Sequence, residues 1–394
     1  GLELAEYAKD ITGTAVDVFV YDTSKDSDGG AWRKRTQGTS WYNETLNTST
    51  RGNRKEFPAV AVIVVENTNH TITIYDADDP DLPMWMVFAD FNARPTYRII
   101  GSGDYGTITA TVSMLNGRFA VGTQGSTGSS ASWDGLYSID FISETALHYN
   151  TAETYGNYKG VIADRNSVGY NTVNSYNFGR IVNAQVNDVA MTVLPNAPVD
   201  SATGLPVPTI AVATNGGVSV ITDSGAVYDI TGFANAAYDP ATTRIDFQDD
   251  NIVITGNDGG YDQQRIWVSN GIITGDVTKS VLHLYDHNTA PYILNPYNSN
   301  DNNSQAVGDG VIAIGMRSVS NALILLAEDP VTPANGMVAY TTSSYNTGWM
   351  NGDIKLATLS DTDTTSAVGA ELVANGTFAS DTDWTKGTGW TISG

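Results

Sequence analysis

The chain has 394 residues and a formal net charge of −23, from 43 acidic residues against 20 Lys and Arg. This charge repels nucleic acid and anionic membranes over most of the surface. The absence of cysteine excludes disulfides and thiolate metal sites, and no apolar run approaches the roughly 18 residues of a membrane helix. With 39 Gly, 20 Tyr and only 16% charged residues, the composition favours strands and turns and predicts an all-β protein.

The first strand is expected at residues 15–22, "AVDVFVYD", and a basic, aromatic segment follows at 31–56. The segment carries six Lys and Arg against Glu44 and Glu56. Arg and aromatic side chains are enriched at interface cores. We therefore expect residues 31–56, within an N-terminal segment 1–56, to dock on acidic neighbours, including further copies of the chain. There are two alternatives: the segment faces DNA in the lumen of a tail, or it is a solvated loop anchored by buried Trp side chains. The predicted contact residues are Trp32, Arg33, Lys34, Arg35, Trp41, Arg51, Arg54 and Lys55.

Strand signals then recur along the chain. Residues 59–65 and 71–75 are β-branched runs around a polar turn, and 83–88 supply a third strand. Three later units repeat one design, in which a strand, a tight polar turn and an apolar strand follow one another. These units are "TVSMLNGRFAVGT" at 111–123, "TIAVATNGGVSVIT" at 209–222 and "RIDFQDDNIVITG" at 244–256.

Repeats of short strands at this spacing are typical of propeller blades, so residues 57–360 are predicted to form a β-propeller of about 5–7 blades. A pair of β-sandwiches is the alternative fold. The last strand, "DIKLATL" at 353–359, is expected to complete a blade begun by residues 15–22. Residues 361–370 have the composition of a linker, and residues 371–394 begin a further module.

Sequence motifs near the two ends of the chain resemble those of a known group of proteins. "TGWMNGDIKLATLSDTDTT" and "ELVANGTFASDTDWTKGTGWTISG", with "DGGAWRKRTQGTSWYNETLN" near the N-terminus, resemble large virion and tail proteins of marine bacteriophages. In that group the "ELVxNGxF" opening begins a jelly-roll, carbohydrate-binding-like β-sandwich. The resemblance implies a virion structural protein, a propeller-containing tail nozzle or tail-tip component that assembles symmetrically around the tail axis. Residues 371–394 are too few for a β-sandwich, so the natural protein is expected to continue past Gly394.

The resemblance also implies partners. These are other virion and tail proteins, a homo-oligomeric ring and a glycan of the host surface, with phage DNA passing through the lumen without sequence-specific binding. No membrane insertion is expected. Trp384 and Trp390 could stack on a sugar ring or fill the core of the new module.

Catalysis has little support, and we expect no enzyme, catalytic residue, cofactor or metal site. His283 and His287 lie in a stretch that resembles a strand, where such a pair is separated by about 13 Å. The acidic turns at 22–30 and 76–83 suggest calcium but do not match EF-hand spacing. The alternative function is a glycan-binding adhesin or a polysaccharide-degrading enzyme on a propeller scaffold.

Overall fold

The computed structural model describes most of the chain up to Tyr285 and the backbone of several strands beyond it. The described ranges are 15–66, 71–88, 99–100, 108–125, 134–151, 158, 160–167, 179–233, 242–257, 264–285, 305–308, 311–316, 322–327, 337–347 and 350–359. With 47% strand and 7% helix, the structure confirms the all-β prediction. Its helices are short 3-10 turns: η1 (Thr23–Lys25), η2 (Ala31–Arg35), η3 (Ile162–Asp164) and η4 (Lys279–Val281). Within these ranges no helix has the length and apolar character needed to cross a membrane.

The strands form five sheets that follow one another along the chain, except that one short strand of the third sheet lies in sequence between two strands of the fourth. The first sheet contains β1 (Ala15–Asp22), β2 (Val60–Glu66), β3 (Thr71–Asp76) and β4 (Met84–Phe88). The second contains β5 (Ile108–Leu115), β6 (Arg118–Gln124), β7 (Leu136–Asp140) and β8 (Ala146–Tyr149). The third contains β9 (Val186–Thr192), β10 (Thr209–Thr214), β11 (Gly217–Ile221), β12 (Val227–Thr231) and β16 (Val277–Thr278).

In the two remaining sheets, as in the first two, the strands lie side by side in the order of the chain. The fourth contains β13 (Thr242–Gln248), β14 (Asn251–Asn257), β15 (Gln264–Val268) and β17 (His283–Tyr285). The fifth contains β18 (Gln305–Gly308), β19 (Val311–Met316), β20 (Ala322–Ala327), β21 (Met337–Thr347) and β22 (Met350–Leu359). Neighbouring strands are antiparallel throughout, except that β16 runs parallel to β12.

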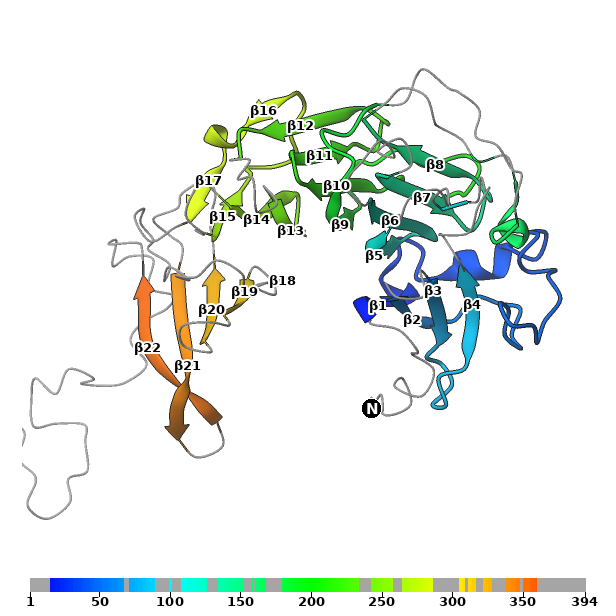
Figure 1. Ribbon diagram of the computed structural model, residues 1–394, viewed down its shortest axis with the longest axis horizontal. Helices are drawn as coiled ribbons and strands as arrows, with labels where there is room; N and C mark the ends of the chain where they lie inside the picture. Colours follow the sequence, from blue (N-terminus) through cyan, green and yellow to red (C-terminus); the bar gives the residue numbers. More distant parts are fainter. Residues whose placement is uncertain are drawn as a thin grey trace, which may run out of the picture.

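The first strand of each sheet lies beside the first strand of the next. β1 contacts β5, β5 contacts β9, β9 contacts β13, and β13 contacts β18. These five inner strands follow one another along the inner side of an arc, with the later strands of each sheet further out (Figure 1). Within the described residues, no sheet closes the arc.

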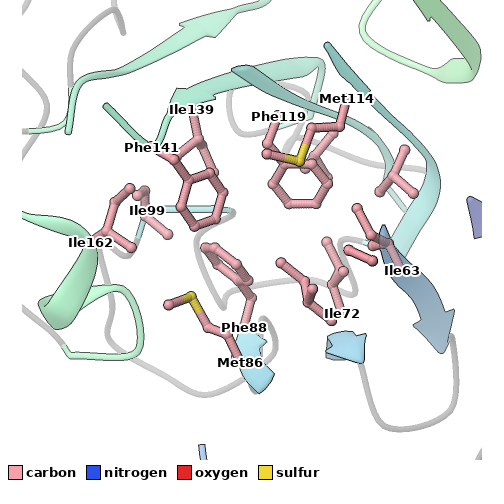
Figure 2. Packing of buried hydrophobic residues seen from close by; sticks show 14 of the residues in the cluster. Ile63, Ile72, Met86, Phe88, Ile99, Met114, Phe119, Ile139, Phe141 and Ile162 are labelled. Carbon is pink, nitrogen blue, oxygen red and sulfur yellow. The ribbon is translucent and has the colours of Figure 1, made fainter. Parts of the chain in front are cut away.

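Apolar side chains fill the space between successive sheets. The largest cluster joins the first two sheets, and Figure 2 shows Phe88, Phe119 and Phe141 turned toward one another within it. The ring centroids of Phe88 and Phe119 are 5.7 Å apart. Ala120, the neighbour of Phe119, belongs instead to the cluster between the second and third sheets. Because successive side chains of a strand point to opposite faces, β6 contributes to both junctions.

The hairpin turns follow the expected chemistry. Asn116 and Gly117 have positive φ values of 54° and 72°, as a type I′ turn between β5 and β6 requires. Asp249 has φ 55° between β13 and β14. In the hairpin of β10 and β11, positive φ falls on Gly217. The three repeated strand–turn–strand units are thus confirmed as hairpins.

Two expectations about the ends of the chain differ from the structure. The predicted pairing of 353–359 with 15–22 is wrong: β22 pairs with β21, and β1 pairs with β2. Each sheet supplies its own first strand, so none is shared between the two ends. The expected domain boundary between residues 56 and 57 also falls inside one packed unit. β1 precedes this boundary in the sequence, β2 follows it, and the two strands pair in one sheet. The linker at 361–370 and the module at 371–394 lie outside the described residues.

Candidate functional site

Four of the inner strands, β1, β5, β9 and β13, line a hollow of about 630 Å³. We call it the inner hollow. Apolar residues such as Val20, Ala190 and Met191 line part of its wall. The charged side chains of its lining are Asp17, Asp22, Lys25, Asp188, Arg244 and Asp246. The hollow therefore has more carboxylates than cations, in keeping with the acidic chain.

Two of these carboxylates connect neighbouring sheets. Asp17 on β1 accepts hydrogen bonds from its neighbour Val18 and, across the junction, from the backbone N–H of Val112 on β5. Asp188 on β9 accepts a hydrogen bond from the backbone N–H of Ile245 on β13, at 3.0 Å. Both carboxylates thus satisfy backbone donors of strands that belong to another sheet.

Asp188 makes further hydrogen bonds, and its side chain is partly buried. Its other oxygen accepts hydrogen bonds from the Thr111 hydroxyl on β5 and from the backbone N–H of Val189. Asp188 therefore contacts three successive inner strands. Burial raises its pKa to about 6, against the lowering effect of the nearby Arg244 guanidinium and of its own hydrogen bonds.

The predicted docking tryptophans lie inside the protein. Trp32 and Trp41 are fully buried in the cluster between the first two sheets. The Trp32 indole donates to Asp26 at 2.7 Å, and the Trp41 indole donates to the carbonyl of Phe141 at 2.7 Å. These side chains anchor the 23–57 segment on the sheets, as the alternative of a loop with buried Trp anchors describes.

Two of the predicted arginines also serve internal contacts. Arg51 is fully buried, donates to the carbonyls of Trp85 and Lys55 at 2.8 and 3.0 Å, and lies 4.4 Å from the centre of the Trp85 ring. Burial lowers its pKa to about 10. Arg54 pairs with Asp76 and Asp78.

The remaining basic residues differ in exposure. Arg33 donates to the carbonyl of Phe57 at 2.9 Å and is largely covered. Arg35 is exposed and pairs with Asp28 at 2.9 Å. Lys34 and Lys55 are exposed, and Lys55 lies over the ring of Tyr42. The predicted strip is therefore divided. Trp32, Trp41 and Arg51 are fully buried, Arg33 and Arg54 are partly buried, and Lys34, Arg35 and Lys55 are exposed.

The acidic turns use their carboxylates within the protein. Asp26 accepts hydrogen bonds from the Tyr21 hydroxyl and the Trp32 indole, and Asp22 caps η1 through the backbone N–H of Ser24. In the second turn, Asp78 accepts from the backbone N–H groups of Ala59 and Val60. Across the described ranges, no group of three or more His, Asp or Glu residues is arranged to hold a metal ion.

Other predicted residues fall outside the description. Trp384 and Trp390 lie outside the described residues, as does His287; for His283 only the backbone is described. The role of sugar contact stays a prediction.

The sequence patterns did not single out Asp17 and Asp188. A usable signal exists, because each is an Asp followed by Val within the first strand of its sheet, in "VDVFV" and "NDVAM". An isolated acid in an otherwise apolar strand indicates a specific hydrogen-bond partner, since a buried carboxylate without one is costly.

Comparisons with known proteins add no family. A scan against protein-family models finds no match, and a search of curated proteins finds no significant match.

Proposed function

We propose that this chain is a structural protein of a bacteriophage virion, a tail nozzle or tail-tip component that assembles symmetrically around the tail axis. The resemblance of both chain ends to marine phage tail proteins supports the proposal. One feature of the described residues carries it further: the carboxylates of the inner hollow hold sheets together. Asp17 and Asp188 use their oxygens to bind backbone N–H groups of the next sheet, which suits a rigid structural part.

The finer architecture that we propose is a β-propeller with one blade per sheet. Three observations support it. Each sheet contains a meander of four or five strands, to which the third sheet adds β16 in parallel with β12. The meanders follow chain order, and each first strand contacts the first strand of the next sheet. Radial repetition of four-stranded sheets is the propeller design, usually with about 4–8 blades.

The proposed partners are other tail proteins, further copies in a ring and a glycan of the host surface. Lys34, Arg35 and Lys55 are the members of the predicted strip that an acidic neighbour could reach. The acidic inner hollow would repel DNA. A path for phage DNA is therefore proposed as passage without sequence-specific binding.

One observation favours the alternative of a polysaccharide-degrading enzyme. Asp188 lines the hollow with its pKa raised to about 6, and a raised pKa is the property of a general acid in glycoside hydrolysis. Its oxygens, however, already accept hydrogen bonds from Thr111, Val189 and Ile245. A carboxyl group whose oxygens already accept these hydrogen bonds is better suited to holding the sheets together than to protonating a substrate. We therefore propose no enzymatic activity.

Immunogold labelling tests the proposal. An antibody raised against the full chain is applied to intact phage particles from the source of the sequence. We expect gold at the tail in several copies per particle. Gold on the capsid, or unlabelled particles, would contradict a tail role. In parallel, the purified chain should release no reducing ends from host surface polysaccharide; release that is abolished by Asp188→Asn would establish the enzymatic alternative.

A further inference from the structure

One face of the first sheet carries an exposed row of valines. Val16, Val18 and Val20 alternate along β1 and are 42%, 53% and 52% exposed. We call these three residues the valine stripe. The pairing of β1 with β2 places Val18 opposite Val64 and Val20 opposite Val62. Val62 and Val64 are fully buried, so the stripe is the uncovered margin of an apolar face.

The other face of β1 is already used. Phe19 and Tyr21 point to the side that packs with the second sheet, where Tyr21 is buried in the shared core. The second sheet shows how a sheet inside the series behaves: Phe119 packs toward the first sheet, and Ala120 packs toward the third. A sheet within the arc thus buries both faces, whereas the first sheet stands at one end of the series.

We propose that the valine stripe is the docking surface for the fifth sheet, β18–β22, of the same chain. This docking closes the arc into a ring by packing of faces, without exchange of strands, and it rests on the propeller architecture proposed above. The fifth sheet is the other end of the series, since β18 contacts β13. Figure 1 shows β1 and the fifth sheet on opposite sides of the opening of the arc.

Tethering favours this occupant over a second copy. Each inner junction already joins the first strand of one sheet to the first strand of the next, and docking of the fifth sheet on the first repeats that contact once more. Docking within one chain is intramolecular and independent of concentration, whereas docking of a free copy requires a second molecule and depends on concentration. Burial of the three valines supplies the hydrophobic driving force.

Photocrosslinking from the stripe tests the proposal. Val18 is replaced by p-benzoylphenylalanine in the full chain, and isotope-labelled and unlabelled chains are mixed equally before irradiation. We expect crosslinked peptides from residues 305–359 of the same chain. Crosslinks between labelled and unlabelled chains, crosslinks to other segments, or an absence of crosslinks would each overturn it. The same probe at Val199, which is 63% exposed away from the stripe, serves as the control and should not crosslink to 305–359.

Paired substitutions give a second, independent measurement. Val18→Thr and Val20→Thr keep the side-chain shape and the β-propensity but place a hydroxyl in the docked face. We expect both to lower the thermal midpoint clearly more than Val199→Thr and Val281→Thr, whose positions are 63% and 65% exposed. Equal midpoints for all four variants would contradict docking. Failure of closure leaves the immunogold result unchanged, so the two proposals fail separately.

Discussion

Asp17 on β1 accepts a hydrogen bond from the backbone N–H of Val112 on β5, 2.9 Å away, and so joins two sheets that share no strand ladder. Asp188 repeats the arrangement between β9 and β13. Ladder hydrogen bonds hold strands together within a sheet, but the junctions between sheets depend on side chains. These carboxylates add to other directional contacts between sheets, such as the hydrogen bond from the Gly117 N–H to the Tyr21 hydroxyl and the one from the Thr214 N–H to the Thr242 hydroxyl.

Loss of the hydrogen bond between Asp17 and Val112 should measurably destabilise the folded protein. One oxygen accepts from Val18 and the other from Val112. In Asp17→Asn one acceptor becomes an NH₂ donor that faces a backbone N–H. We expect the free energy of unfolding to fall by about 1–2 kcal/mol, measured by urea denaturation.

Asp22 on the same strand provides the matched control. It caps η1 through a single oxygen, and Asn is an equally good cap. Asp22→Asn should therefore change stability by less than about 0.5 kcal/mol. Equal losses in the two variants would show that the contact to β5 contributes nothing.

Asp188 predicts a specific pH dependence. Its pKa is about 6 in the folded protein, above the ordinary 3.8, because of burial. Between these values the folded state binds more protons than the unfolded state, so this group makes stability fall as pH rises from about 4 to about 6. The loss amounts to about 3 kcal/mol. Asp188→Asn should remove it, and the difference between the two stability curves isolates the effect; parallel curves would contradict it.

His148 should act in the opposite direction. Burial lowers its pKa to about 4 from 6.5, and its ring stacks on Tyr137 at 4.1 Å. The unfolded state then binds more protons, so this group makes stability fall as pH drops from about 6.5 to about 4. His148→Phe retains a ring for stacking and removes the titration. We expect the variant to lose about 3 kcal/mol less than the parent chain over that interval; an unchanged acid sensitivity would assign the effect elsewhere.

Arginine-to-lysine changes distinguish the interior from the exposed part of the basic segment. The Arg51 guanidinium reaches the carbonyls of Trp85 and Lys55 at once, and an ammonium cannot span both. Arg51→Lys should destabilise the fold by on the order of 3 kcal/mol. Arg35→Lys alters an exposed pair with Asp28 and should cost less than about 1 kcal/mol. Chemical denaturation of both variants measures this contrast, and a small effect at Arg51 would be inconsistent with its buried contacts.

Charge reversal tests the docking role of the exposed cations. Lys34→Glu and Lys55→Glu should leave the isolated protein folded, because both side chains are exposed. If the segment docks on an acidic neighbour, the double variant should fail to enter the particle. Circular dichroism of the double variant should match that of the parent chain, which shows that it is folded. Normal incorporation of this variant into the particle would contradict the docking role.

The hairpins could be predicted because their signals are local. Asn116 and Gly117 specify a tight turn by their own conformational preferences, and the alternating residues on each side specify the strands.

The fate of the basic segment could not be predicted, because burial depends on distant residues. Trp41 donates to the carbonyl of Phe141, 100 positions away, and Arg51 packs on Trp85. A cluster of Arg and Trp has the same composition in an interface and in a core. The partner of the last strand was uncertain for a related reason, since 353–359 has the alternation of a paired strand whichever neighbour it takes.

Electron cryo-microscopy of the assembled phage particle tests the central claim most directly. The account predicts tail density in which several symmetry-related copies surround the axis, each fitted by the five sheets in the order described. A tail reconstruction at side-chain resolution in which every density is explained by other proteins would contradict the proposal that this chain is a structural component of the tail.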